Sequence, residues 1–248
     1  MVGLAALLFP GVVSAEVIFS DTFEGSDIRH AGTVPNFWTV TQSPDSSKSG
    51  ASKEKGRLLL LAANRPYAYV SLASPKMEKF GFFSHPLTIT LDEIQLEAKG
   101  IPEGEARFKV SVASAQTTAE QAEDVISLRI RSGLLLMGYR IDGFNLSSPP
   151  ETLAGEHVNS VAVIPLKGVP KKVSLTLGPS PRDGFVKYEI IVLDDGIPVS
   201  RSGSIPLTIV QWGGNDEASL IIDARRDSDS SLLGTQTEFS LGQITVAR

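Results

Sequence analysis

Short apolar segments with a two-residue period recur along the whole chain, and no stretch shows a sustained helical period. The clearest example is Phe80–Ala98, where Leu87, Ile89 and Leu91 alternate with threonines and a second alternating run follows. Successive side chains of a β-strand point to opposite faces, so such a segment buries one face and leaves the other polar. The pattern therefore predicts a chain that buries its apolar side chains between sheets.

Roughly a dozen segments of this kind occur at spacings of about 8–12 residues, which is typical of all-β folds. We expect strands at Glu16–Phe23, Phe37–Thr41, Arg57–Ala62, Tyr67–Leu72, Leu87–Ala98, Ala106–Ala113, Val125–Arg131, Gly133–Ile141, Lys172–Leu177, Phe185–Leu193, Ile197–Arg201, Ser219–Ala224 and Glu238–Val246. Strands with one polar face indicate two antiparallel sheets packed face to face, that is, an antiparallel β-sandwich. No break in composition divides the sequence, so we expect residues 16–248 to form a single domain.

Turn residues predict how some of these strands are joined. Asp194–Gly196 reads Asp-Asp-Gly between two apolar runs, and Ser132-Gly133 has a similar place; both indicate tight hairpins. Tyr67–Leu72 is expected to be the hairpin partner of Arg57–Ala62. Ser43–Gly56 is polar and without a period, which is typical of a solvated loop.

The hydrophobic pattern of Phe80–Ala98 changes its phase in the middle. Apolar residues occupy odd positions up to Leu91 and even positions from Ile94 onward. A strand whose buried face switches in this way needs an extra residue or a kink. The sequence therefore predicts a bulge or turn at Asp92-Glu93.

Charge and cysteine content exclude several functions. The net charge is −5, from 23 basic and 28 acidic residues, and no basic block interrupts the mixture. Nucleic acid is therefore not an expected partner, and an anionic membrane surface is disfavoured. The chain has no cysteine, which excludes disulfides and thiolate chemistry; many exported bacterial proteins share this property.

The N-terminus resembles an export signal. Val2–Val13 is a short apolar run, and Val13-Ser14-Ala15 places small residues where a signal peptidase cleaves, although no Lys or Arg precedes the run. The run is too short to span a membrane, and no second apolar span follows. We predict that residues 1–15 are a signal peptide, that the protein is secreted or periplasmic, and that it has no transmembrane segment.

Three short stretches carry a family resemblance: Phe19-Ser-Asp-Thr-Phe23, Phe37-Trp38-Thr-Val40 and Gly56-Arg-Leu-Leu-Leu60. Together they resemble the opening of many concanavalin A-like lectin/glucanase sandwiches, which include laminin-G-like domains. The resemblance implies a jelly-roll β-sandwich whose first and last strands pair. Relatives include sugar-binding modules, adhesins, glycoside hydrolases and polysaccharide lyases, so the fold by itself assigns no activity.

One pair of carboxylates has the spacing of a catalytic pair. Glu93 and Glu97 lie in Glu-Ile-Gln-Leu-Glu, which is similar to the Glu-Ile-Asp-x-Glu strand of laminarinase-like retaining glycosidases. In that motif the outer carboxylates are nucleophile and acid/base, and retention needs them about 5 Å apart. Here Gln95 replaces the middle carboxylate, and the predicted kink at Glu93 moves it out of line with Glu97. The alternative is a polar strand face turned to water.

Two further groups of residues are candidates for ligands. Asp223, Asp227 and Asp229, with the later Glu238, would supply the oxygen ligands that Ca²⁺ prefers, although Leu232 stands where an EF-hand loop requires glycine. Trp212 and Asn215 lie in a Gly-rich loop, where a tryptophan could stack on a sugar or instead cap the core. No other cofactor is expected.

These observations support three hypotheses. The first is a secreted, non-catalytic β-sandwich that binds carbohydrate or serves at a surface or in a matrix. The second is a glycoside hydrolase that uses Glu93 and Glu97, and the third is a Ca²⁺-dependent adhesive module.

Overall fold

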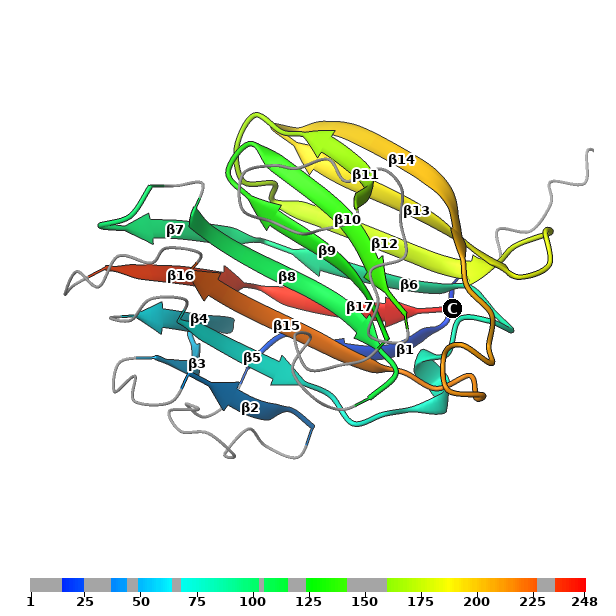
Figure 1. Cartoon of the computed structure of the whole chain (residues 1–248). Helices are drawn as coiled ribbons and strands as arrows, with labels where there is room; N and C mark the ends of the chain where they lie inside the picture. The colour runs from blue at the N-terminus through cyan, green and yellow to red at the C-terminus, as the bar shows by residue number, and fades with distance from the viewer. Residues whose placement is uncertain are drawn as a thin grey trace, which may run out of the picture.

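The computed structural model describes residues 15–24, 37–43, 49–63, 68–102, 105–115, 124–141, 160–226 and 235–248. These residues form seventeen strands in three antiparallel sheets, with one short 3₁₀ helix, Glu78–Phe80. The predicted all-β sandwich is therefore confirmed (Figure 1). Most of the predicted signal peptide, residues 1–14, lies outside the described residues. In the part that is described, no helix has the length and apolar character needed to cross a membrane.

The largest sheet has seven strands. Their order across the sheet is β11 (Ser160–Pro165), β10 (Leu134–Arg140), β9 (Val125–Arg131), β8 (Ala106–Ala113), β15 (Ser219–Arg226), β5 (Tyr69–Ala73) and β2 (Thr39–Gln42). One face of this sheet contributes Phe108, Val110 and Val112 to the main core. Its other face carries the polar residues considered below.

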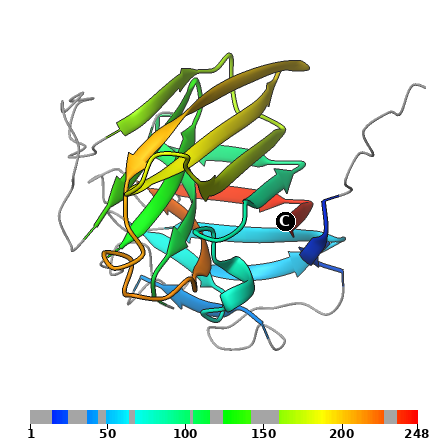
Figure 2. The same cartoon turned by 90° about the vertical axis from the view of Figure 1, so that its right-hand side faces the viewer.

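A six-stranded and a four-stranded sheet face the seven-stranded one. The six-stranded sheet has the order β1 (Val17–Asp21), β17 (Gln243–Ala247), β6 (Leu87–Asp92), β12 (Lys172–Pro179), β13 (Phe185–Asp194) and β14 (Ile197–Pro206). The four-stranded sheet has the order β3 (Gly50–Glu54), β4 (Arg57–Ala63), β16 (Gln236–Leu241) and β7 (Gln95–Lys99). β17 pairs antiparallel with β1, so the first and last strands lie side by side as the resemblance implied (Figure 2).

The two smaller sheets meet along a crease. β6 leads into β7, and the neighbouring β16 leads into β17, so two paired strands bend at the same place (Figure 1). Glu93 has a φ of +55° there, outside both strands, which confirms the kink predicted from the change of phase. Gly242 lies opposite, and its N–H donates to the Asp92 carbonyl at 3.1 Å.

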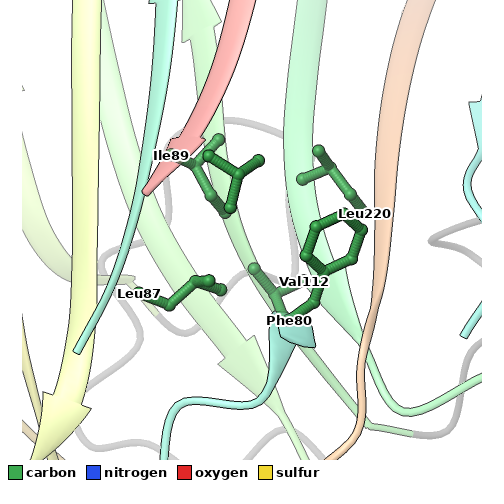
Figure 3. Close-up of a pocket in the computed structure, with 6 residues that line it drawn as sticks. Phe80, Leu87, Ile89, Val112 and Leu220 are labelled. Carbon is green, nitrogen blue, oxygen red and sulfur yellow. The ribbon is translucent and has the colours of Figure 1, made fainter. Parts of the chain in front are cut away.

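The core lies between the seven-stranded sheet and the other two. Phe108 of β8 stacks on Phe239 of β16 with ring centroids 4.3 Å apart, which joins the seven-stranded to the four-stranded sheet. Farther along, Leu87 and Ile89 of β6 come together with Val112 of β8 (Figure 3). The apolar gap among these side chains does not admit a water molecule, so it belongs to the packed core.

Strand pairing confirms some expectations and corrects others. Both predicted hairpins form, and positive φ at Asp195 (+51°) and Gly196 (+78°) is the geometry of a two-residue turn that matches strand twist. The predicted hairpin of β4 with β5 was wrong: β4 pairs with β3 and β16, whereas β5 pairs with β15 and β2. The expected loop Ser43–Gly56 contains β3, and β11 was not predicted at all.

Candidate functional site

The seven-stranded sheet has a polar face that points away from the main core, which we call the outer face. Alternation along β8 places Phe108 and Val110 in the core and therefore Arg107 and Lys109 on the outer face. Register with the neighbouring strands extends this face. It includes Tyr69, Ser71, Ala73, Arg107, Lys109, Ser111, Ala113, Val125, Ser127, Arg129, Arg131, Arg140, Ser219, Ile221, Asp223 and Arg225.

A buried ion pair lies in the middle of the outer face. Asp223 pairs in register with Ser71 on one side and with Lys109 on the other, and Lys109 in turn with Arg129. Lys109 Nζ lies 3.5 Å from Asp223 Oδ2, and both side chains are almost fully buried. Removing one partner of such a pair leaves a buried charge uncompensated, so this pair fixes the middle of the sheet.

Basic side chains outnumber acidic ones on the outer face. In the described strands it carries six cations (Arg107, Lys109, Arg129, Arg131, Arg140 and Arg225) and one carboxylate, Asp223. Arg129, Arg131 and Arg225 are half-buried, whereas Arg107 and Lys109 are buried. In the described strands, this face therefore carries more basic than acidic side chains, although the chain as a whole is acidic.

In the described strands of the outer face, three serine hydroxyls are buried without a hydrogen-bond partner. They are the Oγ atoms of Ser71, Ser111 and Ser219, with exposed fractions of 1% or less. A buried hydroxyl that makes no hydrogen bond costs about 1–3 kcal/mol, so such groups usually meet a water or a ligand. Next to them Ala73, Ala113, Val125 and Ile221 form a small apolar cluster separate from the main core.

The two glutamates of the catalytic hypothesis do not lie on one strand. Glu93 lies in the crease, where its carboxylate accepts a hydrogen bond from Arg57 Nη1 at 2.7 Å and its carbonyl accepts one from Arg57 Nη2. Arg57 also donates to Ser240 Oγ, which donates to Gln95 Oε1 at 3.0 Å. Arg57 therefore braces both bent strands, and the contacts of Glu93 are structural.

Glu97 belongs to a different charge group on the four-stranded sheet. It lies on the exposed side of β7, opposite Glu238 of β16. Lys99 Nζ lies 2.6 Å from Glu238 Oε2 and 3.5 Å from Glu97 Oε2. The hydrogen bond to Glu238, together with the charges of both glutamates, raises the pKa of Lys99. Glu97 therefore lies on a solvent-exposed strand face whose charges pair with one another.

Trp212 is a core residue, so the expectation that it could stack on a sugar was wrong. Its indole is fully buried, and Nε1 donates to the Glu217 carbonyl at 3.0 Å. Its ring meets Phe82 edge-on with centroids 5.1 Å apart. The alternative, a tryptophan that packs at the edge of the core, describes its place. Asn215, in the same loop, is exposed to solvent.

The residues expected to bind Ca²⁺ are only partly described. Asp223 lies on β15 beside Lys109, whose ammonium group repels a cation. Asp227 and Asp229 lie outside the described residues, and Glu238 bonds with Lys99. Among the residues that the structure does describe, no group of three or more His, Asp or Glu side chains could hold a metal.

No protein-family model and no curated protein matches the sequence. Solved structures with similar folds do exist. One is reported with the endo-acting O-glycanases that prominent members of the human gut microbiota express to initiate mucin breakdown (12% identity, TM-score 0.56, covering 94% of this chain and 99% of that one). Another is the winged bean acidic lectin in complex with methyl-α-D-galactose (8% identity, TM-score 0.55, covering 92% and 97%). A third is lectin II from Ulex europaeus (8% identity, TM-score 0.51, covering 94% and 99%).

These likenesses establish the fold. The chain has the concanavalin A-like β-sandwich of the legume lectins, as the resemblance of its first strands implied. At these identities the likeness extends to the arrangement of strands and not to particular site residues.

Proposed function

We propose that the protein is a secreted, non-catalytic module that binds glycans on the outer face of the seven-stranded sheet. The observation that carries the proposal is the group of buried hydroxyls without partners, Ser71, Ser111 and Ser219, on a face that also holds charged side chains and a small apolar cluster. A saccharide offers the complementary groups, namely hydroxyls that donate and accept and C–H surfaces. The shared fold with a galactose-complexed lectin supports the same class of ligand. The export expectation rests on the sequence Val2–Ala15.

The described strands of the outer face lack the pair of carboxylates that glycoside hydrolysis needs. Retaining glycosidases need two carboxyl groups about 5–5.5 Å apart, and inverting ones need a wider pair. In the described strands, Asp223 is the single carboxylate of the outer face, and it is paired with Lys109. The face therefore supplies contacts for binding rather than an acid and a base.

Affinity electrophoresis tests the proposal. The purified protein is run through gels that contain galactan, laminarin, pectin or mucin, and we expect retardation by at least one of them. The double variant Ser71→Ala/Ser111→Ala should lose the retardation while its melting temperature stays within a few degrees of the parent. Ser202→Ala, an exposed serine of β14, is the matched control and should run like the parent. A protein that none of these polysaccharides retards would contradict glycan binding.

A hydrolase remains the second candidate because one of the similar structures is reported with endo-acting O-glycanases. Its predicted residues are Glu93 and Glu97. Incubation with mucin and β-glucans, followed by measurement of new reducing ends, separates the two proposals. We expect no release of reducing ends; release that disappears in Glu97→Gln would establish the hydrolase instead.

A further inference from the structure

We propose that two copies of the chain pair along β14 and form a dimer around a two-fold axis at Ser202. β14 is the last strand at one edge of the six-stranded sheet, and in the described part of the chain it pairs with β13 alone (Figure 1). An edge strand presents unpaired backbone groups that another strand can bind. This edge is separate from the outer face of the seven-stranded sheet, so the proposal does not depend on glycan binding.

The direction of each backbone group on β14 follows from the tight hairpin that joins it to β13. Asp194 and Ile197 flank a two-residue turn and form a hydrogen-bonded pair, so the odd-numbered residues of β14 bond to β13. The even-numbered residues direct their backbone groups toward the open edge. They are Pro198, Ser200, Ser202, Ser204 and Pro206, of which the two prolines lack an N–H. In the described residues, the N–H groups of these three serines have no hydrogen-bond acceptor.

The middle of β14 lacks the features that usually keep an edge strand from pairing, namely bulges, lysines and prolines. Its register with β13 is continuous from one end of the strand to the other. Residues 199–205 include no proline and a single charge, that of Arg201. Pro198 and Pro206 lie at the two ends of the strand, so the segment between them is the part that a second strand can pair with.

The sequence between the two prolines reads almost the same in both directions. From Pro198 to Pro206 it is Pro-Val-Ser-Arg-Ser-Gly-Ser-Ile-Pro, with Ser202 in the centre. A two-fold axis at Ser202 places a second β14 antiparallel to the first. Proline then faces proline, serine faces serine, and Val199 faces Ile205, while the outward N–H groups of the serines donate to serine carbonyls of the second copy. A self-complementary surface of this kind is what an isologous dimer requires.

Arg201 favours this register over its neighbours. With the axis at Ser202, Arg201 lies opposite Gly203 of the second copy. An axis at position 201 would place two arginines opposite each other, and like charges in such pairs destabilise a sheet. An axis at position 203 would place the arginine against Ile205, which is buried. Charge and burial therefore agree with the register that the symmetry of the sequence indicates.

The same register provides electrostatic complementarity across the axis. Gly203 lies against the ring of Tyr188, since a Cβ on the glycine would lie 2.6 Å from the hydroxyl oxygen. Arg201 is exposed and projects from the same side of the sheet as Tyr188. Its guanidinium therefore meets the ring of Tyr188 of the second copy, and a cation against an aromatic ring is a favourable contact.

Exposed apolar side chains lie at both ends of β14. Among the described residues, three of the five exposed large apolar side chains are Ile197, at the start of the strand, and Ile209 and Val210, in the turn that follows it. In an antiparallel pair the start of one strand lies beside the end of the other. Ile197 of each copy therefore comes close to Ile209 and Val210 of the second, and burial of apolar surface adds to the backbone pairing.

Sedimentation equilibrium of the purified protein over a range of concentrations tests the dimer. We expect the mass of two chains. Ser202→Pro removes the central outward donor of each copy without removing a hydrogen bond to β13, and it should raise the Kd of the dimer tenfold or more. Ser202→Ala keeps that donor and is the matched control, which should dimerise like the parent.

A charged variant keeps the test decisive if circular dichroism shows that the proline variant is unfolded. Ser202→Glu places two carboxylates opposite each other at the axis while the side chain stays exposed in the monomer. Its Kd should rise tenfold or more at low salt and fall again as NaCl is raised, because salt screens exposed charges.

Single cysteines test the register, since the chain has none of its own. At the axis the two Cα atoms of position 202 would lie about 5.5 Å apart, a distance that a disulfide can bridge. Ser202→Cys should therefore form a disulfide-linked dimer when oxidised with copper-phenanthroline. Ser204→Cys is the control, because the two copies of position 204 would lie four residues apart along the strands, about 14 Å, and it should stay unlinked.

Three results would overturn the proposal. The first is a protein that remains monomeric at every concentration. The second is a dimer that neither Ser202→Pro nor Ser202→Glu weakens, because its interface would then lie elsewhere. The third is a disulfide that forms as readily in Ser204→Cys as in Ser202→Cys, which would contradict the axis at Ser202.

Discussion

Gly242 and Glu93 are in contact at the crease where two paired strands bend together. A Cβ at position 242 would lie 2.5 Å from Glu93 Oε2 and 2.9 Å from Glu93 Cβ. The second contact involves an atom next to the backbone, which cannot swing away. Arg57 holds the Glu93 side chain in place, so Glu93 cannot move aside to make room for a side chain at position 242.

Gly242→Ala should therefore destabilise the protein by about 1–3 kcal/mol, the usual cost of forcing extra atoms into a packed place. Urea unfolding followed by circular dichroism measures the change. Gly168→Ala is the matched control, because no atom lies within 4 Å of its added Cβ, and we expect it to be nearly neutral. Equal stabilities for the two variants would show that the crease tolerates a side chain.

Trp212 gives a second prediction at the scale of the residue. Trp212→Phe removes the indole N–H that meets the Glu217 carbonyl and leaves part of a filled site empty, so we expect a loss of about 2–4 kcal/mol in the free energy of unfolding. Its retardation in polysaccharide-containing gels should equal that of the parent under conditions where the variant is folded. Asn215→Ala, in the same loop but exposed, should change neither property. If Trp212→Phe kept its stability but lost the gel retardation, Trp212 would stack on a sugar after all.

The glycine-rich neighbourhood of Trp212 correctly indicates a loop, but the burial of the ring could not be predicted from it. Phe82 and Phe83, which cover the indole, lie about 130 residues earlier in the sequence. A contact of that separation depends on topology. Local patterns such as the change of phase at Glu93 depend on neighbouring residues alone, and that prediction was right.

At the scale of elements, two loops are fastened by one carboxylate. Asp216 Oδ1 accepts from the Phe83 N–H and Oδ2 from the Ser84 N–H, both at 3.0 Å. Gly81 allows the approach, because a Cβ there would lie 2.1 Å from the Asp216 carbonyl oxygen. The segment that follows the 3₁₀ helix is thereby joined to the loop that carries Trp212.

Asp216→Ala should cost about 2–4 kcal/mol, because it leaves two backbone donors without a charged acceptor. Asp216→Asn keeps one acceptor oxygen and should lose roughly half as much. Hydrogen exchange at Phe83 and Ser84 is the local measurement, and faster exchange in the alanine variant is expected. Asp183→Ala, an exposed turn residue, is the control. Unchanged exchange at both amides would mean that the carboxylate does not hold the two loops together.

Strand positions were predictable where side chains alternate, and pairing was predictable where a tight turn joins neighbours. β13 and β14 satisfy both conditions. β3 was missed because Gly-Ala-Ser-Lys-Glu has a single small apolar residue, so its strand depends on pairing with β4 and not on its own pattern. β4 and β5 are consecutive in sequence, yet the chain crosses from one sheet to another between them.

At the scale of the whole molecule, the fold brings basic residues from distant parts of the sequence together on one sheet face. Arg107, Arg129 and Arg225 come from three separate segments, each with cations alternating with apolar residues. No basic block is visible along the chain, and the sequence correctly shows a net negative charge. That these three arginines share the outer face follows from the strand order β9, β8, β15, which requires knowledge of sheet topology. Individual strand patterns contain no such information.

The seven-stranded and six-stranded sheets are also joined at one edge by a buried tyrosine. Tyr188 of β13 donates to the Val161 carbonyl of β11 at 3.2 Å, and its ring lies against Gly203, where a Cβ would come within 2.6 Å of the hydroxyl oxygen. Burial raises the pKa of Tyr188, and it raises that of Tyr139 as well. This hydrogen bond requires the protonated phenol, so the contact between the two sheets at this edge depends on pH.

The sign of that dependence follows from linkage. A tyrosine in the unfolded chain ionises near pH 10, whereas buried Tyr188 holds its proton to higher pH. The unfolded state therefore binds fewer protons above pH 10, and the stability that the neutral phenol contributes, which is complete below that pH, is lost as pH rises toward the pKa of the folded state. Tyr188→Phe should lose about 1 kcal/mol at pH 7, from one hydrogen bond, and its stability should then decline less steeply than that of the parent as the pH rises above about 10. Urea unfolding at a series of pH values measures both effects. Lysine ionisation affects the two proteins alike and cancels in their difference, so parallel curves for parent and variant would mean that the phenol is not buried at the edge between the sheets.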